Sequence, residues 1–585
     1  EKLIKEDIYI INETQIQEVH HNFIKNYFFQ EVSPALVTII LNENIELPLL
    51  KDSAAYLIVK MNLKDESKQY ALIEISKAMN RFVVLPKLDG KNYIILIDDL
   101  LRHSLKDIFN IFDYTSISAN MIKITRDGEL DFDSDLSKSF IDKISDSVRD
   151  RKIGEPVRFV YDKTLDDETL IYLMQKMGID SKDSVIPGGR YHNRRDYMGF
   201  PSLGRKDLLY TKINPLPVKD LSLEQSIFNT ISDKDYMVHT PYHTFSYIVN
   251  FLREAALDPT VKSIKITIYR LAQISHVASS LINAAKNGKK VTVSIELRAR
   301  FDEEANINYA EQMQDEGVTM LFGVPGLKVH SKMCIIEREE NQKIKRYGFV
   351  STGNFNESTA RIYTDFTLFT TDQRILKDLN KVFNFFEVNY KIYRYKHIFT
   401  SPHYTQTKLF TLIDNEIENA KIGKSAFIKL KMNSMSSYKM VDKLYEASRA
   451  GVKIQMIIRG ICCLIPGVDG MSDNIEVISI IDKFLEHTRL FIFSNNNDPK
   501  IYISSADWMT RNIDNRVEVS CPIYDTDIKK ELQDIFDICW RDNIKARIIN
   551  QNQDNSYRIP NTDKMIRAQF EIYDFYKNKL EATDA

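Results

Sequence analysis

The sequence contains little cysteine and no long apolar segment, and these two absences exclude several classes of protein. Five cysteines occur among 585 residues, and no two of them have the Cys-x-x-Cys spacing. Neither a disulfide framework nor a zinc site is therefore indicated, and we expect a reducing, cytoplasmic location. Because no run of 18 apolar residues occurs, we expect no membrane-spanning helix. Peripheral association with a membrane surface stays open.

The chain also lacks an excess of positive charge and the usual nucleotide-binding loops. Its formal net charge is −2, so we expect no nucleic-acid partner, and any polyanion site must be a local concentration of Arg and Lys. The Gly-Lys-Ser at 423–425 has Glu418 where a Walker A loop needs its first glycine, and no G-x-G-x-x-G occurs. A P-loop kinase is excluded on this basis. The chain starts at Glu1 without an initiator Met or a signal-peptide pattern. We expect the numbering to begin inside a longer protein.

The length exceeds what one core can hold, and the rhythm of the chain predicts three domains. Residues 1–216 read as an α+β domain without a catalytic constellation. Its turn-rich segment 186–206 is basic and is either a polyanion-binding loop or a solvated loop folded over its neighbour; its cations are Arg190, Arg194, Arg195, Arg205 and Lys206. From 217 on, strands and helices alternate, which predicts α/β domains over 217–397 and 398–585.

The most informative segment, residues 326–370, carries a histidine and a lysine two positions apart. Alternating apolar and polar residues predict a strand over His330–Ile336. Residues two apart on a strand project from the same face, so we expect His330 and Lys332 to lie together. A following strand ends in a small-residue turn that contains Asn354. A histidine, an ammonium and an amide that meet at such a turn suit a phosphoryl group, although a single His-x-Lys is more often structural.

A second copy of this pattern lies downstream. A helix and strand that include Gly288 align with a helix and strand that include Gly451. His487 and Arg489 repeat the His-x-Lys as His-x-Arg, and Asp507 occupies the turn that corresponds to the first small-residue turn. Repetition on this scale indicates an internal duplication of a whole domain.

Two half-sites packed face to face would place His330 and His487 across one cleft. This arrangement resembles the phospholipase D superfamily, whose H-x-K-x-x-x-x-D motif occurs twice. The sequence has Glu337 and Ser494 where that superfamily has its aspartates, and Arg489 in place of the second lysine. These departures disfavour a plain phosphodiesterase.

From about residue 35 on, the chain resembles bacterial polyphosphate kinases of the first, histidine-using type. The runs that carry the resemblance are EPVRFVY (155–161), IPGGRYHN (186–193), PYHTF (241–245), RFDEEANI (300–307), GLKVHSK (326–332), STGNFNESTARIYTDF (351–366), RGICCLIPG (459–467), SDNI (472–475), EHTR (486–489) and YISSADWMTRNID (502–514). The resemblance implies a head domain at 1–216 and two catalytic phospholipase D-like domains. It also implies a reversible transfer of the ATP γ-phosphate to polyphosphate through a phosphohistidine.

The resemblance further implies roles for individual residues. The phosphorylated histidine falls on His330 and the second essential histidine on His487, which also contacts the nucleotide. Further nucleotide contacts fall on Tyr363 and Arg459, and the magnesium region falls on Arg270 and Arg300. Arginine has no lone pair to give a metal, so these two are expected to hold phosphate beside Mg²⁺ rather than to ligate it. Lys332, Asn354 and Arg489 complete the expected phosphate contacts.

Three functions from different classes follow. The first is the kinase, with ATP, ADP and polyphosphate as partners, Mg²⁺ as cofactor and a dimer or tetramer as its assembly. The second is a phospholipase D-like phosphodiesterase or nuclease that uses the same histidines. The third is a catalytically silent polyanion-binding protein. The acidic cluster Asp302, Glu303 and Glu304 reads either as metal ligands or as a solvated helix start.

Overall fold

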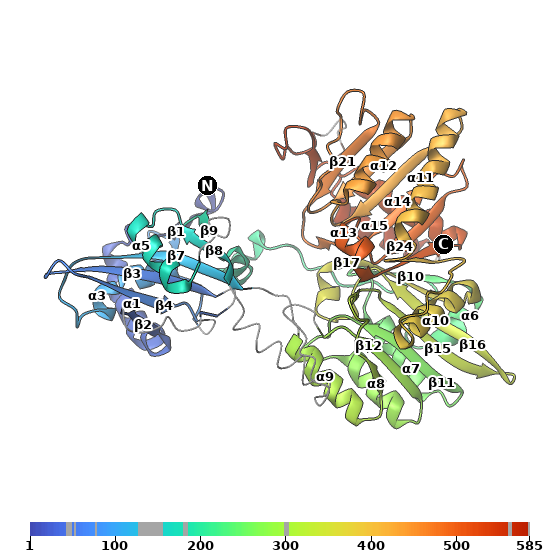
Figure 1. Ribbon diagram of the computed structural model, residues 1–585, viewed down its shortest axis with the longest axis horizontal. Helices are drawn as coiled ribbons and strands as arrows, with labels where there is room; N and C mark the ends of the chain where they lie inside the picture. Colours follow the sequence, from blue (N-terminus) through green and yellow to red (C-terminus); the bar gives the residue numbers. More distant parts are fainter. Residues whose placement is uncertain are drawn as a thin grey trace. The chain divides into compact units, whose positions relative to one another are not determined.

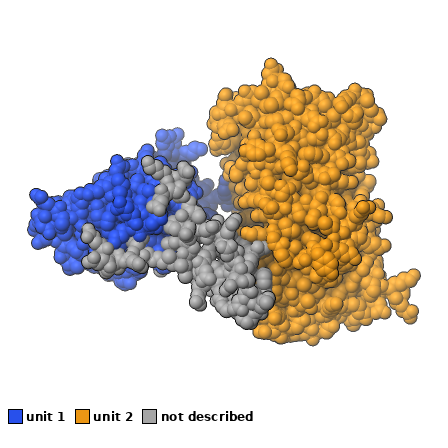
Figure 2. All heavy atoms as spheres, viewed as in Figure 1, with its two compact units in different colours: residues 1–211 blue, residues 212–585 orange. Residues whose placement is uncertain are grey.

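The structure is a computed structural model that describes residues 1–42, 50–51, 54–76, 79–126, 156–179, 185–297, 303–559 and 564–582. The chain divides into two compact units, residues 1–211 and residues 212–585 (Figure 2). The second unit contains both predicted α/β regions, 217–397 and 398–585, together with the few residues that precede them. Among the described residues, no helix is long and apolar enough to cross a membrane.

The first unit is an α+β structure with two sheets. The larger has the strand order β2-β4-β3-β7-β8-β9 and the smaller the order β1-β6-β5. The strands are β1 (Ile8–Ile11), β2 (Val37–Leu41), β3 (Ala55–Leu63), β4 (Lys68–Glu74), β5 (Phe82–Leu88), β6 (Lys91–Leu96), β7 (Tyr114–Arg126), β8 (Pro156–Asp162) and β9 (Val185–Gly188). The helices are α1 (Glu18–Tyr27), α2 (Ile97–His103), α3 (Leu105–Ile108) and α5 (Asp167–Met177).

The second unit begins with an α/β half built on one mixed sheet (green to yellow in Figure 1). Its strand order is β10-β17-β16-β15-β11-β12-β13. The strands are β10 (Tyr236–Thr240), β11 (Val261–Ile268), β12 (Lys290–Ile295), β13 (Thr319–Leu321), β15 (Met333–Glu340), β16 (Lys343–Ser351) and β17 (Tyr363–Thr370). The helices are α6 (Ile227–Asp233), α7 (Ser246–Leu257), α8 (His276–Lys286), α9 (Glu303–Asp315) and α10 (Gln373–Glu387).

The other half is built the same way (orange to red in Figure 1), with the strand order β18-β26-β24-β23-β19-β20-β21-β27. Its strands are β18 (Phe399–Thr400), β19 (Phe427–Met432), β20 (Lys453–Ile458), β21 (Ile475–Ile480), β23 (Leu490–Phe493), β24 (Lys500–Ser504), β26 (Val519–Ile523) and β27 (Ala546–Ile549). Its helices are α11 (Thr405–Lys421), α12 (Tyr438–Arg449), α13 (Thr510–Asp514), α14 (Thr526–Trp540) and α15 (Ala568–Glu581).

The two sheets correspond strand by strand over seven positions, from β10 with β18 to β13 with β21, and β27 is added at the end of the second. Helices α8 and α12 correspond as well. Gly288 and Gly451 follow them with φ of 74° and 93°, a backbone conformation that glycine adopts at least cost. The duplication predicted from the sequence is confirmed, and so is the predicted class of an α+β region followed by two tandem α/β domains.

One apolar core joins the two halves. It contains Leu379 and Phe383 of α10 from the first half together with Leu532 and Phe536 of α14 and Ile572 of α15 from the second, all of them buried. Burial of each such side chain contributes about 1.5–3 kcal/mol. Because the core is common to both, the loops at the strand ends of the two halves are held against each other.

Candidate active site

The segment that carries His330 leaves its own sheet and pairs with the other half. Strand β14 (Lys328–Val329) runs parallel to β25 (Arg516–Val517). The backbone N–H groups of His330 and Ser331 both donate to the Val517 carbonyl, at 3.0 and 2.9 Å. Strand β15 starts only at Met333. The prediction of a strand from His330 was therefore wrong for its first three residues, because the second half takes their hydrogen bonds.

The His330 ring is nearly enclosed and held by a carboxylate of the second half. Its side chain lies among buried groups, with the residue 8% exposed. Nδ1 lies 2.9 Å from Oε2 of Glu518, and the ring meets that of Tyr269 edge-on, 4.8 Å between centroids. Burial lowers the pKa of His330 well below its usual value, and the positive charges of Lys332 and others add to this effect. The imidazole is thus neutral near pH 7, and with Nδ1–H donated to Glu518 its Nε2 keeps a lone pair.

Other buried donors fix the carboxylate of Glu518 in turn. The Ser505 hydroxyl donates to Oε2 at 2.5 Å, and the Asn512 amide donates to Oε1 at 2.7 Å. Burial raises the pKa of Glu518, while Lys332 and Arg516 act in the opposite direction. The two donors give Glu518 a fixed orientation as an acceptor.

Lys332 lies beside His330, although the strand on which this expectation was based starts only at Met333. Its ammonium group donates to the His330 carbonyl oxygen and lies 5.2 Å from the centroid of the Tyr269 ring. Burial lowers the pKa of Lys332 well below its usual value. The guanidinium of Arg270 lies 5.6 Å from the same ring. Tyr269, which sequence reasoning missed, is a common surface for all three groups.

His487 is held in the same way with the halves exchanged. Strand β22 (Leu485–Glu486) runs parallel to the first residues of β17, Tyr363 and Thr364. Nδ1 of His487 lies 2.8 and 2.9 Å from the two carboxylate oxygens of Asp365. The Tyr363 ring is 5.2 Å from the imidazole, between centroids. Burial lowers the pKa of His487, and Arg489 acts in the same direction while Asp365 opposes them.

Arg489 connects the two histidine clusters. Its Nη1 lies 3.0 Å from Nε2 of His487, and its Nη2 donates to Oδ2 of Asp507 at 3.0 Å. Burial raises the pKa of Asp507, but the neighbouring guanidinium outweighs it and holds the pKa at about 2. The same guanidinium contributes to the low pKa of His330. The two imidazoles therefore share one electrostatic environment.

Arg459 is connected to this environment through Asn433, and Asn354 follows Gly353, which lies against Asp365. Nη2 of Arg459 donates to the Asn433 side-chain oxygen at 2.8 Å, and its Nε donates to the Glu486 carbonyl at 2.8 Å. The backbone N–H of Asn433 donates to Asp507 at 2.8 Å. The side-chain oxygen of Asn354 is buried, and among the described residues it has no hydrogen-bond partner.

The carboxylates Asp365 and Glu518 were missed by sequence reasoning, but a signal for them exists. Asp365 follows Asn354 by the same number of positions as Glu518 follows Asp507. The Thr352 hydroxyl donates to Asp365 at 2.6 Å, as Ser505 does to Glu518. Extending the alignment of the duplicated halves past the small-residue turns would have paired these acids.

Other groups singled out in the sequence either lie outside the described residues or are paired within the first unit. Arg300 and Asp302 lie outside the described residues, as do the side chains of Glu303 and Glu304. In the first unit, Arg190 forms ion pairs with Glu13 and with the buried Asp99, and Arg205 pairs with Glu6 and Asp207. These contacts favour the interpretation of segment 186–206 as a loop folded onto its own unit.

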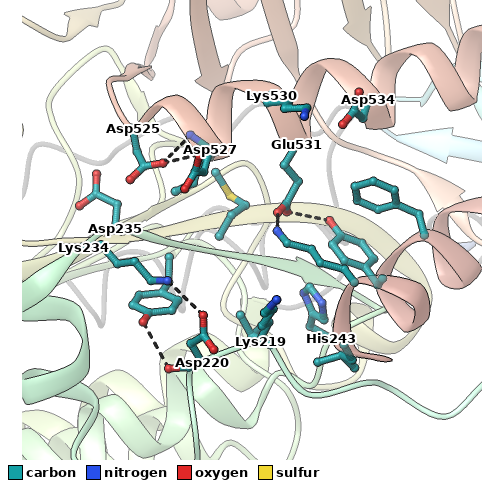
Figure 3. A pocket seen from close by; sticks show the side chains of 18 of the residues that line it. Lys219, Asp220, Lys234, Asp235, His243, Asp525, Asp527, Lys530, Glu531 and Asp534 are labelled. Atoms are coloured by element: carbon teal, nitrogen blue, oxygen red, sulfur yellow. Dashed lines mark hydrogen bonds and ion pairs between the residues drawn. The ribbon is translucent and has the colours of Figure 1, made fainter. Parts of the chain in front are cut away.

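A cavity of about 430 Å³ in the second unit (Figure 3) has neither His330 nor His487 in its lining. Four lysines and six carboxylates line it together with His243. The Lys234 ammonium donates to Asp220 at 3.2 Å, and the Tyr576 hydroxyl donates to Glu531 at 3.2 Å. An excess of carboxylates repels polyanions, so this cavity is not the candidate phosphate site.

A duplicated α/β unit with two carboxylate-held histidines and a buried arginine beside them defines a class of protein suited to phosphoryl chemistry. Family models match most of the chain: the polyphosphate kinase middle domain over residues 19–200, C-terminal domain 1 over 226–392 and C-terminal domain 2 over 398–569. The chain belongs to the polyphosphate kinase family, and it is thus an enzyme.

Individual relatives match over nearly the whole chain. The chain is 44% identical to a polyphosphate kinase from Vibrio parahaemolyticus, covering 99% of this chain and 84% of the relative. It is 42% identical to one from Escherichia coli K12, covering 99% and 85%. A crystal structure of polyphosphate kinase from Porphyromonas gingivalis superposes with a TM-score of 0.83 at 34% identity, covering 99% of this chain and 86% of that chain.

Proposed function

We propose that the chain transfers the γ-phosphate of ATP reversibly to inorganic polyphosphate through a phosphohistidine on His330. The observation that carries this proposal is the state of the His330 ring, which is buried, neutral and oriented through Nδ1 by Glu518. A neutral imidazole with one nitrogen fixed as a donor presents the other as a nucleophile.

In the first step, Nε2 of His330 attacks the γ-phosphorus of ATP. The new N–P bond forms with the imidazole lone pair, and the bond to the bridging oxygen breaks, so that its electron pair leaves with ADP. The ring becomes more positive as the bond forms. The Glu518 carboxylate at Nδ1, 2.9 Å away, stabilises that charge.

Cations around the ring would neutralise the transferring phosphoryl group. Lys332 and Arg270 approach from the side of Tyr269, and Arg489 approaches from His487. Arrival of an anionic phosphate favours the ammonium form of Lys332, whose pKa burial lowers in its absence. Positioning and charge neutralisation of this kind supply most of the rate in phosphoryl transfer. Asn354 and Arg300 extend the proposed phosphate contacts.

In the second step, a terminal oxygen of polyphosphate attacks the phosphorus, the N–P bond breaks and its electron pair returns to Nε2. His487, from the other half, is proposed to stabilise the group in transfer, or to protonate it from Nε2 when the ring is an imidazolium, the form that Asp365 favours against burial and whose pKa burial lowers. The Asp365 carboxylate keeps Nδ1–H of His487 as a donor, and thereby directs Nε2 into the site. Tyr363 and Arg459, on the same side, are the proposed nucleotide contacts.

Mg²⁺ would enter this reaction with the nucleotide. Among the described residues, no group of three His, Cys, Asp or Glu side chains could hold a metal ion. Mg²⁺ is commonly held by substrate phosphates with few protein ligands, and when bound it withdraws charge from the β and γ oxygens. The residues present therefore suit a metal held by ATP, with Arg270 beside it rather than ligating it. A cytoplasmic dimer or tetramer remains the expected state.

Labelling with γ-³²P-ATP tests the proposal. We expect a covalent adduct that is labile in acid and stable in base, present in the natural sequence and absent from His330→Ala. His276→Ala is the matched control, because its ring is largely exposed and belongs to neither cluster. Label retained by His330→Ala, or no label in the natural sequence, would refute the phosphohistidine. The phosphodiesterase alternative predicts no adduct from ATP, and a silent binder predicts polyphosphate retention without turnover.

A further inference from the structure

The segment that leads into His487 is hydrogen-bonded along both edges. In an extended segment, the backbone groups of successive residues point to opposite sides. The odd-numbered residues point to the first half: the Leu485 N–H donates to the Ile362 carbonyl at 2.8 Å, and the His487 N–H donates to the Thr364 hydroxyl at 3.1 Å. Within the described residues, β22 pairs with only one strand, β17.

Two side chains satisfy the opposite edge, where a second strand would otherwise lie. The side-chain oxygen of Gln569 accepts from the Phe484 N–H at 2.8 Å, and its Nε2 donates to the Phe484 carbonyl at 2.8 Å. Two residues further, Arg459 donates to the Glu486 carbonyl at 2.8 Å. The amide of Gln569 therefore makes the same pair of bonds that a neighbouring strand makes with one residue.

Gln569 also acts on the side chains that flank His487. Its Nε2 donates to Oε1 of Glu486 at 2.7 Å. The other oxygen of Glu486 pairs with the Lys431 ammonium at 2.6 Å, and Lys431 donates to the Thr488 hydroxyl as well. All these groups are buried, and Gln569 itself has no exposed surface. The residues on both sides of the imidazole are thus linked to this amide, Glu486 directly and Thr488 through Lys431 and Glu486.

The C-terminal segment places this amide firmly. The Ala568 N–H, at the start of α15, donates to Asp542 at 2.7 Å. Arg567 forms two bonds, of 2.6 and 2.7 Å, with Asp482, which lies just before the segment that leads into His487. Further along α15, Tyr576 donates to Glu531 beside the acidic cavity (Figure 3). These contacts anchor the helix at its start and at Tyr576, so the amide cannot shift without breaking them.

We propose that Gln569 is a positioning residue for the phosphoryl transfer, which it serves by fixing the segment that presents His487. This inference rests on the proposed function, since it needs His487 to act in the transfer. A displacement of about 1 Å at a reacting group can cost about 100-fold in rate. Gln569 adds contacts at Phe484 and Glu486, on the edge of this two-residue strand opposite β17, to those that Asp365 and Arg489 make with the imidazole itself.

Two substitutions separate positioning from simple loss of packing. Gln569→Leu keeps the volume but leaves the Phe484 backbone groups and one Glu486 oxygen without partners. Gln569→Glu keeps the shape, yet an ionised carboxylate cannot donate and repels Glu486. Burial and that repulsion raise the pKa of the introduced carboxyl. When protonated, it donates one hydrogen bond, so lowering the pH should restore activity in this variant alone. Ile572→Val, on the same buried face of α15, is the control for weakened helix packing.

The experiment measures kcat and KM for ATP from pH 6 to pH 8.5 in full-length protein, with the thermal midpoint of each variant. We expect Gln569→Leu to lower kcat about 30- to 100-fold while KM changes less than about 3-fold. At pH 8.5, kcat of Gln569→Glu should be as low as that of Gln569→Leu. From pH 8.5 to pH 6, the ratio of its kcat to that of the natural sequence should rise about 10-fold. Ile572→Val should stay within about 3-fold of the natural sequence.

Two results would overturn the inference: natural kcat in Gln569→Leu, or a loss in Gln569→Glu that does not vary with pH. Failure of the proposed function looks different. In that case the natural sequence itself gives no acid-labile ³²P adduct from γ-³²P-ATP, whatever the variants do. Labelling of the natural sequence in the same series therefore decides which of the two statements is wrong.

Discussion

Nδ1 of His330 lies 2.9 Å from Oε2 of Glu518, a residue 188 positions away in the other half of the second unit. His487 and Asp365 repeat this relationship in the opposite direction. Each half thus supplies the imidazole for one cluster and the carboxylate for the other. Neither half can orient its own histidine alone, so both reactive groups exist only when the duplicated halves are packed together.

Replacing the carboxylate beside His330 tests this exchange. Glu518→Gln keeps the shape but removes the charge that stabilises the ring as the N–P bond forms. We expect kcat to fall about 100-fold or more with KM for ATP nearly unchanged, by analogy with the loss of the carboxylate in other carboxylate–histidine pairs. Steady-state kinetics and the rate of ³²P labelling measure it. Glu416→Gln is the matched control, since Glu416 is equally buried and bonds the backbone of Asn495; an equal loss there would contradict the prediction.

A methyl group at Gly353 should displace the carboxylate beside His487. A Cβ built there would lie 2.0 Å from Oδ2 of Asp365, which forces that side chain to move. The second half has Ala506 at the corresponding place. We expect Gly353→Ala to lower kcat about 10- to 100-fold, measured with ATP and long polyphosphate. The reverse change, Ala506→Gly, should cost less than about 3-fold. Equal activities of the two variants would show that Asp365 tolerates the shift.

The His330 imidazole should not gain a proton at mildly acidic pH. Its pKa lies well below the usual 6.5, chiefly because of burial. The neutral form therefore persists as the pH falls through 6.5, where an exposed histidine becomes half protonated. NMR of ring-labelled histidine from pH 8 to pH 5.5 measures this, with His330→Gln to assign the signal. A midpoint near 6.5 for that signal would be inconsistent with the enclosed ring.

The acidic cavity should lower stability at neutral pH. Burial raises the pKa of Asp235 to about 6 from 3.8, and Asp372 and Asp525 add repulsion. The folded chain then holds a proton that the unfolded chain has lost, so its stability declines as the pH rises from about 4 to 6. Asp235→Asn avoids this loss. We expect it to raise the free energy of unfolding by up to about 3 kcal/mol at pH 8 and by little at pH 4.

Thermal or urea unfolding of the second unit at the two pH values checks this prediction. Asp534→Asn, another carboxylate of the same cavity, serves as the comparison. A stabilisation by Asp235→Asn that is the same at pH 4 and pH 8 would show that its cause is not the ionisation of Asp235.

Much of the architecture could be predicted because its signals are local. Alternation of strands and helices, and glycines such as Gly288 and Gly451 after corresponding helices, depend on hydrogen bonds within a few residues. The paired motifs of His330 and His487 could be found for the same reason, since a duplication repeats spacing along the chain.

Repeated spacing could have paired the two carboxylates with each other, but the partners of the carboxylates and of the helix amide could not be predicted in this way. Glu518, Asp365 and Gln569 reach their partners across 83 to 188 positions, and no short-range pattern records such a contact. The prediction of a strand from His330 was wrong for the same reason, because the N–H groups of His330 and Ser331 donate to the distant Val517 carbonyl.

By itself, the sequence determined the duplicated α/β halves, the two histidines and the cations near them, since each of these follows from periodicity or repeated spacing. Only the tertiary structure decided which carboxylate orients which imidazole and that a C-terminal amide holds the segment before His487. Such partners are chosen by packing through a common core, where buried donors and acceptors must be paired wherever along the chain they originate.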